Sequence, residues 1–288
     1  MYERVARRAE AVVEALPYLR RYHGKILVIK YGGRVLTDPE IGIKMIEDIV
    51  LLKYAGMYPV LVHGGGPTIT SKLEKKKIKS KFVKGMRVTT PDVMKVVESV
   101  LEKISRRLAS DIKKAGVRSK RFFGRKGRLL KAKQCLVKTS KGKFLDLGLT
   151  GIITEVKKSA LTKAMKRDFI PVVTSIAIGP RGKHYNVNAD RAASAIAGAL
   201  KASKLILLTD VRGVLDRKGD LISEINSKKA NSLINRCVIR GGMIPKVLCS
   251  LEALSHGVEK VHIIDGKIPR ALLLEVFTDS GIGTMVVK

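Results

Sequence analysis

The chain has 288 residues, 45% of them hydrophobic, so it can bury a substantial core in one large α/β domain or in two smaller lobes. It carries 57 Lys and Arg against 25 Asp and Glu, and this formal net charge of +32 is spread along the whole sequence. No stretch approaches the ~20 consecutive apolar residues of a transmembrane helix, and the charged N-terminal segment lacks the apolar centre of a signal peptide. We therefore expect no membrane partner and a cytoplasmic location.

The cysteines and aromatic residues exclude several kinds of site. Cys135, Cys237 and Cys249 are scattered, without CxxC or Cys/His spacing, so we expect neither a disulfide framework nor a zinc site. The positive charge would attract polyanions, anionic substrates or an acidic partner protein, although a solvated basic surface can accompany any fold. With 5% aromatic residues and no Trp, a stacking platform for single-stranded nucleic acid is poorly supported.

The first segment, residues 2–20, has apolar side chains at helical spacing and arginines on the other face. Pro17 is expected to kink or end this helix. An apolar stripe that precedes the first strand must be buried either on its own domain or on another subunit.

The first predicted strand is the apolar run 26–29, which ends in Lys30, Gly32 and Gly33. Glycines after a strand let backbone N–H groups approach a phosphate, and a lysine at the strand end supplies a point charge for it. The segment is neither a GxxxxGK[ST] loop nor a GxGxxG fingerprint, so this signal is weak by itself.

The second strand, residues 58–63, is followed by Gly64, Gly65 and Gly66. A tight turn is the simplest interpretation of these glycines. Three in a row are costly because each loses more conformational freedom on folding than any other residue, so bare amides for an anionic group are the better explanation. Arg87 follows in a predicted hairpin, and in so basic a chain it could be one more surface charge.

Residues 186–215 form the most informative stretch. The continuous apolar run 205–208 is typical of a parallel strand covered on both faces. Ligands of open α/β sheets bind beyond the carboxyl ends of such strands, so Asp210 lies where chemistry is expected, although it could simply cap the next turn. Asn186, Asn188 and Asp190 are three short polar side chains before an alanine-rich helix, which indicates a site more than a cap.

Lys246 comes at the start of a predicted helix, after Gly241 and Gly242. The helix dipole disfavours a cation in the first turn unless an anion is bound there. This placement therefore indicates an anionic ligand.

Six segments in this order together resemble the amino-acid kinase family, and within it most closely the branch that phosphorylates N-acetyl-L-glutamate in arginine biosynthesis. They are VIKYGG (28–33), VHGGGP (62–67), GMRVT (85–89), NVNAD (186–190), LILLTDVRGVL (205–215) and GGMIPK (241–246). The resemblance implies an α/β fold, an open three-layer αβα sandwich with a mainly parallel central sheet. It further implies an oligomerisation helix at 1–22, a lobe for acetylglutamate and dimerisation at 23–198, and an ATP lobe at 199–288.

The resemblance also implies the reaction and its residues. ATP with Mg²⁺ would phosphorylate the side-chain carboxylate of acetylglutamate to an acyl phosphate, in the cytoplasm or in the plastid stroma of a photosynthetic eukaryote. The implied roles are phosphoryl binding by Lys30 and Lys246, their orientation by Asp190, phosphate or nucleotide contacts from Gly32, Gly33 and Asp210, and substrate contacts from Gly64, Gly65, Arg87 and Asn186.

In the family, an N-terminal helix marks the arginine-inhibited members, in which homodimers join into hexamers. Glu275, Gly281 and Gly283 resemble the arginine site of those members, although the surrounding positive charge would repel a cationic effector. Arg212 departs from the usual pattern beside the expected nucleotide pocket.

Three other functions stay open at this point. One is a kinase of lysine or ornithine biosynthesis that acts on aminoadipate or glutamate held by an acidic carrier protein. Another is a protein that binds polyanions non-specifically on a kinase fold, and the third is a uridylate kinase, which the pattern around Arg87 and Asn186 disfavours.

Overall fold

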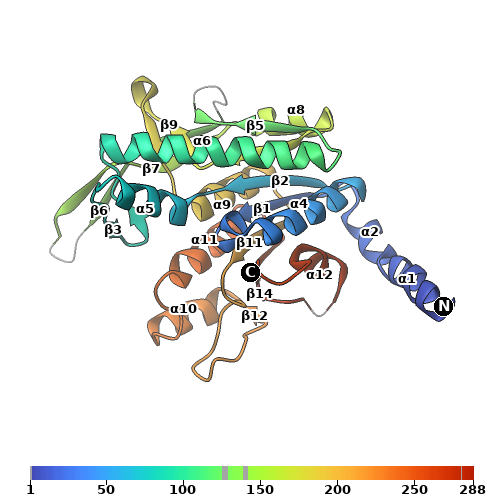
Figure 1. Ribbon diagram of the computed structural model, residues 1–288. Helices are drawn as coiled ribbons and strands as arrows, with labels where there is room; N and C mark the ends of the chain where they lie inside the picture. Colours follow the sequence, from blue (N-terminus) through green and yellow to red (C-terminus); the bar gives the residue numbers. More distant parts are fainter. Residues whose placement is uncertain (1, 125–128, 139–141, 280) are drawn as a thin grey trace.

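The computed structural model describes residues 2–124, 129–138, 142–279 and 281–288 (Figure 1). The helices of these residues are α1 (Tyr2–Glu14), α2 (Leu16–Tyr22), α3 (Arg34–Thr37), α4 (Pro39–Tyr54), α5 (Gly66–Lys75), α6 (Pro91–Lys114), α8 (Lys158–Lys166), the short η1 (Pro180–Gly182), α9 (Ala189–Leu200), α10 (Ser227–Asn235), α11 (Met243–Ser255) and α12 (Ala271–Phe277). The strands are β1 (Ile26–Tyr31), β2 (Tyr58–His63), β3 (Phe82–Val83), β4 (Met86–Arg87), β5 (Ser119–Phe122), β6 (Leu130–Lys138), β7 (Phe144–Val156), β8 (Ile170–Thr174), β9 (Ile176–Ile178), β10 (His184–Asn186), β11 (Lys204–Thr209), β12 (Glu224–Ile225), β13 (Lys260–Asp265) and β14 (Thr284–Val286).

The central sheet has the strand order β12-β14-β13-β11-β1-β2-β8-β5. Neighbouring strands from β13 to β5 pair in parallel, and β14 is antiparallel to β13. The sheet is therefore mainly parallel and open, which confirms the predicted fold class.

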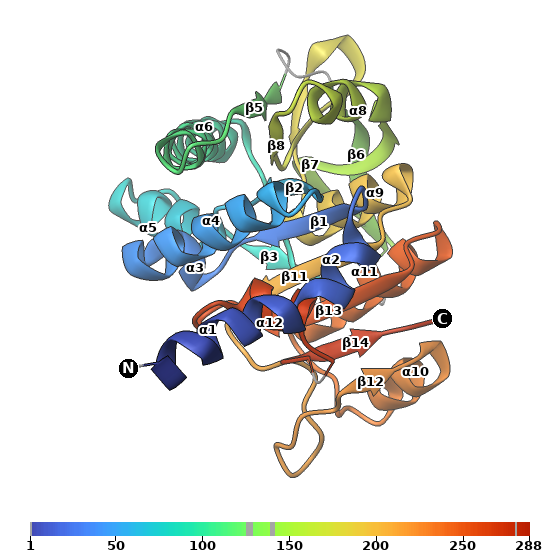
Figure 2. The ribbon, with the colours of Figure 1, turned by 90° about the vertical axis from the view of Figure 1, so that its right-hand side faces the viewer.

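Helices cover both faces of this sheet (Figure 2). Along β11, Leu205 and Leu207 belong to the core beneath α8, α9 and α11, whereas Ile206 and Leu208 belong to the core beneath α4 and α12. Successive side chains of a strand point to opposite faces, so a strand buried on both sides needs an unbroken apolar run. This is the physical reason for the run that the sequence displays.

A smaller sheet with the order β10-β7-β6-β9 lies beside the central one, and it closes into a barrel because β9 also pairs with β10. The hairpin β3–β4 packs on it, because Val83 and Met86 contact the buried Cys135, Val137 and Leu147 of β6 and β7. The small sheet therefore supports the hairpin that carries Arg87.

Helix α1 projects from the body of the molecule (Figures 1 and 2). Val12 and Val13 on this helix are 69% and 67% exposed. The interruption precedes Pro17, which lies in the first turn of α2, where a missing N–H is tolerated. Among the described residues, no helix combines the length and apolarity needed to cross a membrane.

Candidate functional site

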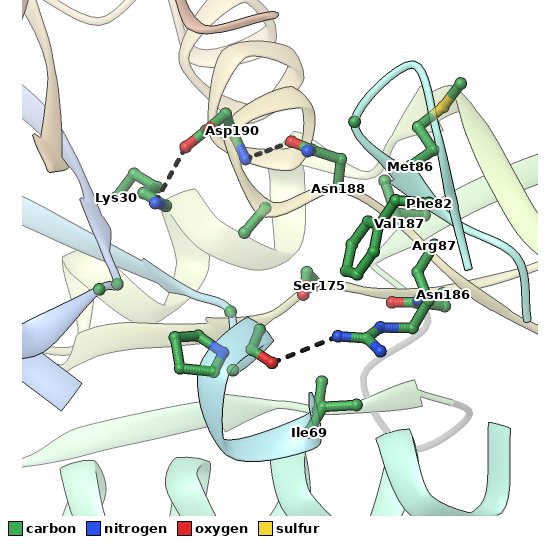
Figure 3. A pocket seen from close by; sticks show the side chains of 18 residues that line it. Lys30, Ile69, Phe82, Met86, Arg87, Ser175, Asn186, Val187, Asn188 and Asp190 are labelled. Carbon is green, nitrogen blue, oxygen red and sulfur yellow. Dashed lines mark hydrogen bonds and ion pairs between the residues drawn. The ribbon is translucent and has the colours of Figure 1, made fainter. Parts of the chain in front are cut away.

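A pocket of about 210 Å³ opens where β1 and β2 end, between the start of α9 and the β3–β4 hairpin (Figure 3). Parallel strands bring their carboxyl ends to one edge, so loops far apart in sequence meet there. The predicted residues that line the pocket are Lys30, Gly32, Gly33, Gly64, Gly65, Arg87, Asn186 and Asp190.

Asp190 lies between two lysines. Its Oδ1 is 3.1 Å from Lys30 Nζ at the end of β1, and its Oδ2 accepts a 2.9 Å hydrogen bond from Lys246 Nζ in the first turn of α11. Oδ1 has an ion pair but no well-aligned hydrogen bond among the described residues. Two ammonium groups on one carboxylate leave a net positive charge beside the pocket.

Burial and charge act against each other on these groups. Burial raises the pKa of Asp190, but the ammonium groups of Lys30 and Lys246 outweigh burial and lower it to about 2. Burial also lowers the pKa of Lys30, an effect that Asp190 opposes. Asp190 therefore remains an anion and an acceptor at any physiological pH.

Local structure fixes this arrangement. Asn188 caps α9, and its Oδ1 accepts hydrogen bonds from the backbone N–H groups of Asp190 and Arg191 at 2.9 and 3.1 Å. The small residues of α9 allow α11 to pack closely, since a Cβ on Gly198 would come within 2.7 Å of the His256 Cβ. The close packing of α9 and α11 brings Lys246 to Asp190.

The glycine loops are shaped by close approaches. Gly33 has a φ of +65°, and a Cβ there would lie 2.5 Å from the Asp210 carboxylate, so Asp210 comes from the end of β11 to the edge of the pocket. A Cβ on Gly64 would lie 3.0 Å from the Ala189 Cβ, and one on Gly65 would lie 2.9 Å from Leu101. Packing therefore favours glycine at 64 and 65, whatever the amides bind.

Arg87 is buried, not a surface charge. Its guanidinium donates to Ser80 Oγ at 2.6 Å, to Thr70 Oγ1 at 2.7 Å and to the Gly66 carbonyl at 3.3 Å, and it stacks 4.5 Å from the centroid of the Phe82 ring. These partners are neutral, so they position the cation without neutralising it. Burial lowers the pKa of Arg87, as expected for a cation that lacks compensating charge from its neighbours.

Asn186, one of the predicted substrate residues, donates to Thr89 Oγ1 at 3.2 Å, which connects it to the segment after β4. Other lining residues were missed by sequence reasoning. Ser175 and Phe82 also line the pocket. Ser175 directly follows β8, the neighbour of β2, and its place after an apolar strand was a usable signal; nothing in the sequence indicated Phe82.

The three residues predicted to bind an effector also meet in space. Glu275, Gly281 and Gly283 line a cavity of about 290 Å³ beside α2. Glu275 accepts a 3.1 Å hydrogen bond from the Ile282 N–H and pairs with His262. Burial raises the pKa of Glu275, but the hydrogen bond and charge of His262, the Ile282 N–H and the charge of Lys204 together outweigh burial and lower it.

The amino acid kinase family model matches residues 25–265. Among curated proteins, the acetylglutamate kinase of Aquifex aeolicus is 47% identical, with 97% of each chain covered, and that of Syntrophus aciditrophicus is 44% identical, with 99% of this chain and 98% of the relative covered.

Among solved structures, N-acetylglutamate synthase of Neisseria gonorrhoeae, in complex with coenzyme A and N-acetyl-glutamate, has a TM-score of 0.87 and 26% identity. That comparison covers 97% of this chain, which spans 63% of the synthase. Carbamate kinase of Giardia lamblia bound to AMP-PNP, with a TM-score of 0.64, 15% identity and coverage of 92% and 99%, shares the fold. The chain belongs to the amino acid kinase family, and its similarity over nearly its whole length places it among the acetylglutamate kinases of that family.

Proposed function

We propose that this protein transfers the γ-phosphoryl group of ATP to the side-chain carboxylate of N-acetyl-L-glutamate, which yields an acyl phosphate for arginine biosynthesis. One observation carries the proposal. Asp190 holds Lys30 and Lys246 beside a pocket, in a chain of which 97% matches the acetylglutamate kinase of Aquifex aeolicus. We place the reaction in the cytoplasm.

The chemistry needs positioning and charge neutralisation more than proton transfer. A carboxylate with an ordinary pKa of about 4.3 is already ionised near neutral pH, so the nucleophile requires no general base. Lys30 and Lys246 would stabilise the negative charge on the transferring phosphoryl group. Asp190, with a pKa of about 2, stays ionised and keeps both ammonium groups in place.

Substrate binding would use the end of the pocket near the hairpin. The buried Arg87 guanidinium is held by neutral oxygens and would pair with a carboxylate of acetylglutamate. Asn186 and the amides of Gly64 and Gly65 would contact the rest of the substrate. Residues 23–198 would form this lobe, and they include every residue that lines the pocket.

The nucleotide would bind on the other side of Asp190. Gly32 and Gly33 would offer amides to the phosphates, and Asp210, whose carboxylate lies against Gly33, would line the nucleotide site. Residues 199–288 would form the ATP lobe. Mg²⁺ is usually held through substrate phosphates and one or two carboxylates, and here it would offset phosphate charge.

Assembly and regulation form the finer part of the proposal. The apolar face of α1, exposed at Val12 and Val13, would pair with a second copy and join homodimers into a hexamer. Arginine would bind in the cavity of Glu275, Gly281 and Gly283 and would inhibit by preferring one state of the ring. Lys204 and Lys260 line the same cavity, and their charge would weaken the binding of a cation.

The test is an ADP-release assay in which acetylglutamate, glutamate, aminoadipate and UMP are offered separately with ATP and Mg²⁺. Acetylglutamate should be the substrate that supports turnover. Turnover with UMP but not with acetylglutamate would instead indicate a uridylate kinase. Activity that needs an amino acid held on an acidic carrier protein would favour the carrier-dependent kinases.

A further inference from the structure

His63 is a buried ring next to the pocket that has no assigned role. It ends β2, is 0% exposed and contacts two neighbouring segments. Its Nδ1 is 3.2 Å from the Gly64 carbonyl oxygen, and its Nε2 is 3.0 Å from Thr174 Oγ1 at the end of β8. The ring therefore connects the glycine loop to the neighbouring strand.

The two partners select one tautomer. A carbonyl oxygen only accepts hydrogen bonds, so Nδ1 must carry a proton. Burial lowers the pKa of His63 to about 4, and the ring is neutral near pH 7. Nε2 then has no proton, and it accepts the hydrogen bond that the Thr174 hydroxyl donates.

A fixed Gly64 carbonyl also fixes the next amide. In a planar trans peptide the C=O of Gly64 and the N–H of Gly65 point in opposite directions. The carbonyl faces the buried ring, so the Gly65 N–H faces the other side, where Gly64 and Gly65 line the pocket. Within the described part of the chain, no hydrogen bond uses this N–H.

The glycines make an external anchor necessary. A peptide between two glycines has no Cβ on either side, so its plane rotates more easily than most. The backbone carbonyl of His63 also accepts a 3.3 Å hydrogen bond from the Ser175 N–H, and Ser175 lines the pocket as well. His63 thus contacts both Gly64 and Ser175, and these two segments line the same side of the pocket.

We propose that His63 is a positioning residue, whose Nδ1–H holds the Gly64 carbonyl so that the Gly65 N–H is aimed at an anionic oxygen of the reactants. The proposal rests on the function given above, in which that oxygen belongs to the carboxylate or to the transferring phosphoryl group. A preorganised amide stabilises charge because it need not reorient during the reaction.

Two substitutions separate positioning from simple packing. In His63→Asn the side-chain amide nitrogen can replace Nδ1 and restore the bond to Gly64, whereas in His63→Gln it lies nearer the position of Nε2, toward Thr174. His63→Gln should lower kcat by ~10-fold or more, with a much smaller change in the KM for acetylglutamate. His63→Asn should recover most of that loss although it removes more volume, and the exposed His256→Gln serves as a control.

Several outcomes decide the matter. Equal kcat values for His63→Gln and the parent would overturn the proposal, as would losses that follow the melting temperatures of the two variants instead of their amide donors. A ¹⁵N NMR spectrum of the parent with His63 protonated at Nε2 would overturn it without any variant. A parent enzyme that does not phosphorylate acetylglutamate would instead contradict the proposed function.

Discussion

The single carboxylate of Asp190 has two cationic partners, and this excess of positive charge determines what the residues of the site can bind. One carboxylate neutralises one lysine, so the cluster with Lys30 and Lys246 keeps a positive charge beside the pocket. Such a cluster attracts anions, and this attraction is stronger where the surroundings exclude water.

Removing either lysine should therefore affect the transition state most. We expect Lys30→Ala and Lys246→Ala each to lower kcat by ~10²-fold or more, with smaller changes in the KM for acetylglutamate, because charge develops on the phosphoryl oxygens during transfer. Steady-state kinetics measures this. Lys131→Ala, which removes only an exposed pair with Glu155, is the matched control. Parental turnover in both site variants would show that the site is elsewhere.

The burial of His63 should make the free energy of unfolding depend on pH. Burial is the largest cause of its low pKa of about 4, against an ordinary value of 6.5, and the charge of Arg121 adds to it. The neutral ring contributes fully above pH 6.5, and this contribution falls by up to about 3 kcal/mol as the pH drops toward 4, because the unfolded state binds the proton first.

Urea unfolding of the parent and of His63→Asn at pH 7, 5.5 and 4.5 tests this dependence. The stability advantage of the parent should shrink steadily toward low pH. A constant difference between the two proteins across this range would mean that His63 does not titrate in the way its burial implies.

Residues at the ends of strands were predicted from the sequence better than residues whose place depends on long-range contacts between strands. Lys30 and Asp210 end apolar runs, so the rule for parallel sheets located them correctly. Phe82 could not be assigned in this way, because its position depends on which hairpin packs on the small sheet. His63 also ends an apolar strand, but its contact with Thr174 depends on the long-range pairing of β2 with β8.

Among the helices, α1 is expected to take part in the assembly of several chains. Its apolar stripe is exposed at Val12 and Val13, and exposed valines on a projecting helix are best explained by contact with another chain. A chain that starts at Gly24 should form smaller particles than the full chain in light scattering. Val12→Asp should also reduce the mass, whereas Glu14→Ala on the same helix should not; equal masses for all four would exclude a role in assembly.

The basic region 116–146 is the part of the fold that sequence reasoning could not organise. In β6, Leu130 and Ala132 are buried while Lys131 and Lys133 alternate with them at more exposed positions. This period of two is compatible with any half-buried strand. Only the pairing with β7 and β9 assigns β6 to the small sheet, while β5, in the same basic region, joins the central one.

The net charge of +32 belongs to the molecule as a whole. One dense portion is the segment 72–84, where seven lysines accompany a single glutamate next to the pocket-lining hairpin. We expect the protein to bind heparin at low salt and to release it steeply as salt rises. Changing Lys75, Lys76 and Lys77 to Glu should lower the salt concentration at elution without changing kcat. Retention that is independent of salt would contradict an electrostatic origin.

In the proposed reaction, a carboxylate of acetylglutamate becomes an acyl phosphate through the two lysines held by Asp190. Hydroxylamine traps acyl phosphates as hydroxamates, so the decisive measurement is hydroxamate formation from acetylglutamate, ATP and Mg²⁺. We expect ATP-dependent hydroxamate with the parent and ~10²-fold less with Lys246→Ala. ADP release without hydroxamate, or equal hydroxamate from the parent and Lys246→Ala, would contradict it.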